Sequence, residues 1–145
     1  MTDPEPMDED RVRRSLSHAL ALQARSLLEL TMLAGGLRGL SGVGTKSQLR
    51  QFVQHELEDT YLLTEKLVSL GGSAAVDLEK VEVGRDAQRA LARLLEHEGE
   101  VIAALHAVIP FSGQEPRSEA LEHLLEHVIM RKQQQADFVA LAVEG

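Results

Sequence analysis

Residues 56–72 read ELEDTYLLTEKLVSLGG, a stretch in which an apolar helical stripe carries two acidic side chains. Leu63, Leu67 and Leu70 recur at intervals of three and four, the period of one face of an α-helix. Continued backwards, this spacing places Glu56 and Asp59 on the same inward face. The glycine pair that ends the stretch is a typical helix stop. The stretch therefore predicts a core-facing helix with carboxylates inside.

Three further segments share this period, so the sequence predicts four helices. Thr45 followed by Gln48 matches a capping box, which predicts that the quoted helix begins at Thr45 after a loop over residues 39–44. Pro110 is expected to stop the third helix and Pro116 to open the fourth. The expected helices cover Asp8–Gly39, Thr45–Leu70, Asp86–Val108 and Pro116–Val143.

The lengths of the connections permit a one-crossover topology, although they do not exclude a simple up-down-up-down bundle. The first and last are short, so each joins an antiparallel helix pair. The middle connection, residues 72–84, has thirteen residues and no clear period. Fully extended at about 3.3 Å per residue it reaches about 40 Å. A helix of about 26 residues has nearly that length, about 39 Å. The fold expected is all-α, a four-helix bundle with one long crossover between its second and third helices.

Composition narrows the class of protein. With 145 residues, no cysteine and 3% aromatics, the chain suits one aliphatic helical domain without disulfides. The net charge of −8 makes nucleic acid an unlikely partner, and no run of apolar residues is long enough to span a membrane. No signal peptide is evident, so a cytoplasmic location is expected. Residues 1–14 are expected to form a flexible or partly helical tail, and residues 15–145 the bundle.

The four stripes are interrupted at one level by polar residues. Six of them are expected to point inward: Gln23, Glu56, Asp59, Glu98, Lys132 and Gln135. Buried carboxylates need a compensating cation, which here is either Lys132 or bound metal. The alternative is that these side chains lie at the edge of the stripe and are partly solvated, because a shift of one residue rotates a helical position by about 100°.

These residues resemble the bacterioferritins and related ferritin-like proteins, over residues 15–142. Residues 56–72 resemble the family's Glu-x-x-His helix with its Leu-x-Gly ending. Residues 78–84 (LEKVEVG), leading into residues 94–98 (LLEHE), resemble its crossover and its third helix with a bridging glutamate. The resemblance implies a ferritin-like four-helix bundle.

The resemblance also implies which positions correspond to the family's dimetal ligands. The family pattern is Glu on the first helix, Glu-x-x-His on the second, Glu on the third and Glu-x-x-His on the fourth. Only Glu56 and Glu98 are kept here. The replacements are Gln23 for glutamate, Asp59 for histidine, Lys132 for glutamate and Gln135 for histidine. Leu57 stands at the position of the haem-binding methionine, so no haem is expected.

Three functions follow from this altered ligand set. The leading one is an oligomeric, bacterioferritin-related protein with a degenerate ferroxidase centre and a non-catalytic structural or interaction role. The second is iron storage or binding of another divalent metal at Glu56, Asp59 and Glu98. The third is a shell subunit that assembles with an intact ferritin. A homo-oligomer, at least a dimer and at most a closed cage, is expected in each case.

Several surface residues were also candidates for metal binding. Members of a pair three or four residues apart share a helix face, and the candidate pairs are His55/Glu58, His97/Glu100, His123/Glu126 and His123/His127. The alternative is that these pairs bind no metal and belong to acidic helix faces exposed to solvent. Glu29 and Met32 are expected to face solvent or a neighbouring subunit.

Overall fold

The computed structural model describes residues 3–144, without the side chains of Leu40 and Ser41. Residues 1, 2 and 145, which belong to the expected tail and bundle, lie outside the described residues. Within residues 3–144 there are four long helices and no strand, which confirms the all-α prediction. The helices are α1 (Glu9–Gly36), α2 (Gly39–Ser69), α3 (Ala87–His106) and α4 (Pro116–Glu144), with a short 3-10 helix η1 (Ile109–Phe111) before α4.

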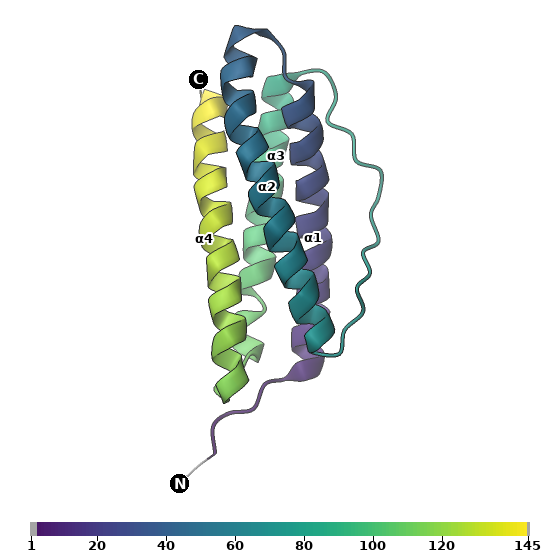
Figure 1. Ribbon diagram of the computed structural model, residues 1–145, viewed down its shortest axis with the longest axis vertical. Coiled ribbons are helices and arrows are strands. Elements are labelled where there is room, and N and C mark those ends of the chain that lie inside the picture. Colours follow the sequence, from purple (N-terminus) through teal and green to yellow (C-terminus); the bar gives the residue numbers. More distant parts are fainter. Residues whose placement is uncertain (1–2, 145) are drawn as a thin grey trace.

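The helices form two antiparallel pairs joined by the long crossover (Figure 1). From the end of α2 the chain runs the length of the bundle outside α1 and enters α3 at the opposite end. The helix α1 packs against both α2 and α3, and α3 packs against α4. The contact between α2 and α4 is sparser than these three. The one-crossover topology predicted from the loop lengths is confirmed.

Two apolar clusters fill the interior, one on each side of the polar positions. One cluster contains Leu16, Leu20, Leu63, Leu67, Leu105, Leu121 and Leu125. The other contains Leu30, Leu33, Leu49, Phe52, Leu91, Leu94 and Val139. Phe52 meets Phe138 edge-on at a centroid distance of 5.4 Å. Burial of these side chains supplies the main driving force for folding, and it fixes the rotation of each helix.

The start of α2 was predicted wrongly. The helix begins at Gly39 and not at Thr45, so residues 39–44 are helical and the turn is only Leu37 and Arg38. Gly39 has a φ of 80°, a value that glycine adopts without strain and that reverses the chain there. Gly42 is buried against Leu37, and a Cβ at Gly42 would lie 3.5 Å from that side chain. Tertiary packing therefore continues the helix through residues that sequence preference assigns to a loop.

The segment before α1 is fastened to the corner between α3 and α4. The N–H of Asp8 donates to the carbonyl of Phe111, and the N–H of Gln114 donates to the carbonyl of Glu5. Met7 is buried in the first apolar cluster. Asp8 also caps α1 by accepting from the N–H of Arg11, so helical structure starts at Glu9.

Within residues 3–144 no helix combines the length and apolarity that crossing a membrane requires.

Candidate functional site

The six polar residues expected inside the bundle form one layer between the two apolar clusters, called here the polar layer. All six are almost completely buried: Gln23, Glu56, Asp59, Glu98, Lys132 and Gln135. Each lies on the apolar stripe of its helix, so the packing that buries the neighbouring leucines also buries the polar side chain. The structure therefore places these residues in the core and not at a solvated stripe edge.

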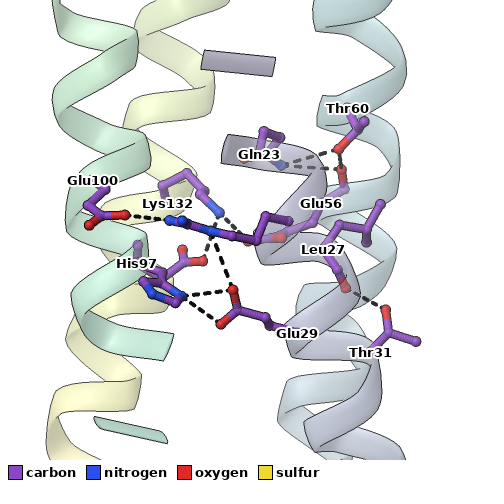
Figure 2. Close-up of polar contacts among 11 residues, drawn as sticks. Gln23, Leu27, Glu29, Thr31, Glu56, Thr60, His97, Glu100 and Lys132 are labelled. Carbon is purple, nitrogen blue, oxygen red and sulfur yellow. Dashed lines mark hydrogen bonds and ion pairs between the residues drawn. The ribbon is translucent and has the colours of Figure 1, made fainter. Parts of the chain in front are cut away.

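Lys132 lies at the centre of the polar layer. Its Nζ donates to Oε1 of Glu56 at 2.5 Å and to Oε1 of Glu98 at 2.9 Å. Figure 2 shows Lys132 reaching from α4 toward Glu56 on α2. The same ammonium therefore joins three helices, α2, α3 and α4, through two charged hydrogen bonds.

Burial changes the proton affinity of this group of side chains. Loss of solvation raises the pKa of Glu56 to about 8, although the charge of Lys132 acts in the opposite direction. The nearby carboxylate of Glu98 raises it further. Burial alone would lower the pKa of Lys132, but the charges of Glu56 and Glu98 outweigh burial and raise it. Lys132 is therefore held in its charged form, and Glu56 holds a proton more tightly than an exposed glutamate does.

Asp59 belongs to a different part of the polar layer. Two basic side chains of α4 lie near it: Nη1 of Arg131 at 3.6 Å and Nε2 of His127 at 4.0 Å from its Oδ1. Burial raises the pKa of Asp59, and the charge of Arg131 is the largest effect in the opposite direction. The sequence analysis missed Arg131. Its place next to Lys132, four residues after His127, is the signal that could have located it on this side of α4.

The two glutamines are not equivalent. Nε2 of Gln23 donates to Oγ1 of Thr60 at 3.3 Å and lies 3.5 Å from the carbonyl of Glu56. Neither polar atom of the Gln135 side chain has a hydrogen-bond partner in the described part of the chain. Gln23 therefore ties α1 to α2, whereas Gln135 contributes an unused amide to the core.

The polar layer does not fit a dimetal centre as it stands. In such a centre, bridging carboxylates hold two cations, whereas here the ammonium of Lys132 lies between the carboxylates of Glu56 and Glu98. A protonated lysine has no lone pair to give to a metal, and it repels cations. Across residues 3–144, no three His, Cys, Asp or Glu side chains are grouped closely enough to hold a metal ion. Metal binding at Glu56, Asp59 and Glu98 stays a prediction.

A second polar cluster lies outside the layer, between α1 and α3, and it corrects the expectation for Glu29. Glu29 is 7% exposed and does not face solvent. Both of its oxygens lie 2.7 Å from Nδ1 of His97 (Figure 2), and Arg25 approaches it at 3.4 Å. Arg25 also pairs with Glu100. Met32 is exposed, as expected.

The histidine pairs of the sequence analysis are arranged differently from a chelating pair. His97 contacts Glu29 and not Glu100. His123 lies 3.8 Å from Glu119, and Nε2 of His127 accepts a hydrogen bond from Nη2 of Arg131 at 2.8 Å. His97 therefore contacts α1 from α3, whereas His123 and His127 contact neighbours on α4, and His127 also lies 4.0 Å from Asp59 of α2.

Comparison with known proteins agrees with this architecture. The Ferritin family model, described as a ferritin-like domain, matches residues 15–144. No curated protein sequence is significantly similar to the chain. A solved structure described as ferritin-like, diiron-carboxylate proteins from Bacillus anthracis superposes with a TM-score of 0.81 at 17% identity, over 94% of this chain and 97% of that one.

Two further structures share the fold. A Dps1 mutant from Mycobacterium smegmatis has a TM-score of 0.77 at 17% identity, over 93% of this chain and 96% of that one. The bacterioferritin-related protein from Bacteroides fragilis, described as a dodecameric thioferritin, has a TM-score of 0.75 at 13% identity, over 95% of this chain and 89% of that one. At these identities the likeness concerns the fold alone.

Proposed function

The chain belongs to the ferritin-like domain family, and we propose that it is an oligomeric structural or interaction protein whose core is held by an ion network in place of a ferroxidase centre. The observation that carries this proposal is the position of Lys132. Its ammonium hydrogen-bonds both glutamates of the layer, at 2.5 and 2.9 Å, and compensates charge that a dimetal centre compensates with cations.

Two features support a role without redox chemistry. Oxidation of Fe(II) by a ferritin-type centre needs two metals held by carboxylates and imidazoles. In the polar layer, Lys132 and Gln135 replace the fourth-helix pair of ligands, and Asp59 is directed to Arg131 and His127. The bundle thus retains its packing while its interior is neutralised by its own side chains.

The oligomeric part of the proposal rests on the relatives and on exposed apolar residues. One structural relative is described as dodecameric. On this chain, Leu28 and Met32 of α1 and Leu57, Tyr61 and Val68 of α2 are exposed. Exposed apolar side chains on these two neighbouring helices are available for contact with a second copy, as are Met130 and Leu141 of α4.

Metal analysis and oxygen consumption test the proposal together. The purified chain is expected to contain no stoichiometric iron or zinc, and addition of Fe(II) is expected to leave the rate of oxygen consumption at the buffer value. The positive control is the variant that carries Gln23→Glu, Asp59→His, Lys132→Glu and Gln135→His, which is expected to bind iron. Stoichiometric metal with Fe(II)-dependent oxygen uptake in the natural chain would refute the proposal.

Two alternatives give different results in the same experiments. An iron-binding protein that uses Glu56, Asp59 and Glu98 needs Lys132 to move away, so iron would bind and Lys132→Met would tighten it. A shell subunit of a mixed cage would co-purify with a ferritin that has intact ligands. The central position of Lys132 between Glu56 and Glu98 favours the first proposal over the iron-binding one, and co-purification distinguishes it from the mixed cage.

A further inference from the structure

The polar layer contains many polar atoms that the chain itself does not satisfy. Among residues 3–144, the buried side-chain atoms without a hydrogen-bond partner number nine, and all but Nε of Arg25 belong to the polar layer or to Ser26. Ser26 lies on α1 three residues after Gln23, on the same inward face. Native interiors leave few such atoms unpaired, because each loses its solvation without compensation. A protonated Glu56 can share a hydrogen bond with Glu98, whereas the polar atoms of Asp59 and Gln135 are left for a partner outside the chain.

The unpaired atoms indicate what kind of molecule completes it. They are Oε1 of Gln23, Oγ of Ser26, Oε2 of Glu56, both Oδ atoms of Asp59, Oε2 of Glu98, and Oε1 and Nε2 of Gln135. Nearly all are oxygens that accept hydrogen bonds, and the possible donors are the amide of Gln135, the hydroxyl of Ser26 and the carboxyl group of Glu56 when it is protonated. The occupant therefore has to donate more hydrogen bonds than it accepts from the chain, or carry positive charge.

The charges in the layer favour a neutral occupant. Lys132 already lies between Glu56 and Glu98, and Arg131 already faces Asp59. An additional cation near these carboxylates would be repelled by both side chains. Water supplies two donors without charge, and it is small enough for an interior closed by helix packing.

The seam between α2 and α4 gives a polar route into the layer. Side-chain exposure decreases from His127 at 41% to Arg131 at 23% and Asp59 at 0%. The separations of Oδ1 of Asp59 from Arg131 and from His127, 3.6 and 4.0 Å, are too long for direct hydrogen bonds. Polar groups at such distances are often bridged by water.

We infer that the polar layer binds ordered water molecules, which enter between α2 and α4 past Arg131 and His127 and donate to the unpaired oxygens of Asp59, Glu98 and Gln135. This inference rests on the proposed function, since it requires Lys132 and not metal at the centre of the layer. The two proposals can fail separately. A layer without water would contradict this inference and leave the ion network intact, whereas bound metal would contradict the ion network itself.

Water contacts in solution test the inference directly. In the full-length protein, the side-chain amide protons of Gln135 are expected to show dipolar cross-peaks with water in nuclear magnetic resonance spectra. The methyl groups of Leu16 and Leu121, equally buried in the apolar cluster, are expected to show none and serve as the dry control. Absence of water cross-peaks at Gln135, with its amide signals assigned and slow to exchange, overturns the inference.

A pair of variants gives an independent readout. In a hydrated layer, Gln135→Leu removes a hydrogen-bond partner of the bound water. The other polar groups that this water contacts then lose their hydrogen bonds, so the melting temperature is expected to fall. In a dry layer the same change replaces an unpaired amide by hydrocarbon, and the melting temperature would rise. The matched control is Gln134→Leu, at an exposed position of the same helix, which is expected to change the melting temperature little.

A comparison of salts separates water from a bound cation. The melting temperature is expected to be equal in potassium, sodium and choline chloride at the same ionic strength. A rise that is specific to potassium or sodium, and that is lost in Gln135→Leu, would assign the layer to a monovalent cation and overturn the inference. Stoichiometric iron or zinc would instead contradict the proposed function.

Discussion

Lys132 carries its charge into the interior at the point where α2, α3 and α4 meet. A buried ammonium is costly unless it is paired and hydrogen-bonded, and here Glu56 and Glu98 accept two of its three possible hydrogen bonds. The reverse also holds, because those carboxylates depend on Lys132. At the residue scale, the stability of the core therefore depends on Lys132, the common partner of both glutamates.

Replacement of Lys132 by methionine tests this dependence. The change keeps the length of the side chain but leaves Glu56 and Glu98 without their common partner, so the free energy of unfolding is expected to fall by about 3–5 kcal/mol. Urea denaturation followed by circular dichroism measures it. The control is Lys80→Met in the exposed crossover, expected within about 0.5 kcal/mol of the natural chain. An unchanged stability of Lys132→Met would mean that Lys132 is solvated.

The raised pKa of Glu56 predicts a specific pH dependence. Between its ordinary value of 4.5 and its folded value of about 8, the folded chain binds more protons at Glu56 than the unfolded chain does. Stability contributed by this group is therefore lost as the pH rises from about 5 to 8. The variant Glu56→Gln lacks that titration, so its stability relative to the natural chain is expected to increase over this range and then level off.

Denaturation series at several pH values measure this difference. The matched control is Glu58→Gln, two residues further along α2 at an exposed position, which is expected to keep the pH slope of the natural chain. A constant difference between Glu56→Gln and the natural chain from pH 5 to 8 would contradict a raised pKa of Glu56.

At the scale of elements, the first turns of α2 deserve a direct test, because the sequence and the structure disagree there. Gly44 is exposed, helical and free of positive φ, and a Cβ at this position meets nothing within 4 Å. Glycine in a helix interior is less stable than alanine by about 0.5–1 kcal/mol. Gly44→Ala is therefore expected to stabilise the protein by about that amount in thermal or chemical denaturation.

The same substitution at Gly39 is the control. Gly39 has a φ of 80°, where a side chain is strained, so Gly39→Ala is expected to destabilise. If α2 began at Thr45 as the capping box predicts, Gly44→Ala would bring no helical gain. The two variants thus distinguish the structural start of α2 from the one inferred by sequence pattern.

At the scale of the whole molecule, the exposed apolar residues of α1 and α2 determine assembly in our proposal. The chain is expected to sediment as an oligomer at micromolar concentration. Leu57 and Tyr61 are each 61% exposed, one turn apart on α2. The double variant Leu57→Asp with Tyr61→Asp is expected to shift the population toward monomer, because burial of two charges at an apolar contact is unfavourable.

Analytical ultracentrifugation measures this shift. The matched control is Met130→Asp, at a residue 55% exposed on α4, which is expected to leave the oligomer unchanged. A natural chain that stays monomeric at micromolar concentration would remove the oligomeric part of the proposed function and leave the ion network untouched.

From the sequence, four helices were predicted, a single crossover was permitted, and six polar residues were expected on the inward faces. These predictions follow from helical periodicity and connection length, which are properties of neighbouring residues and can be read from the sequence directly. Position-matched replacement at Lys132 and Gln135 also pointed to altered chemistry in the layer.

Tertiary structure alone decided the partners of those residues. The start of α2 at Gly39, the burial of Glu29 beside His97, and the pairing of Asp59 with Arg131 depend on how helices far apart in sequence meet. Periodicity gives the face on which a side chain lies, but not the depth or rotation at which two faces come together. That geometry is fixed by side-chain packing across the bundle, so Lys132 could be placed inside from the sequence, whereas its position between Glu56 and Glu98 required the fold.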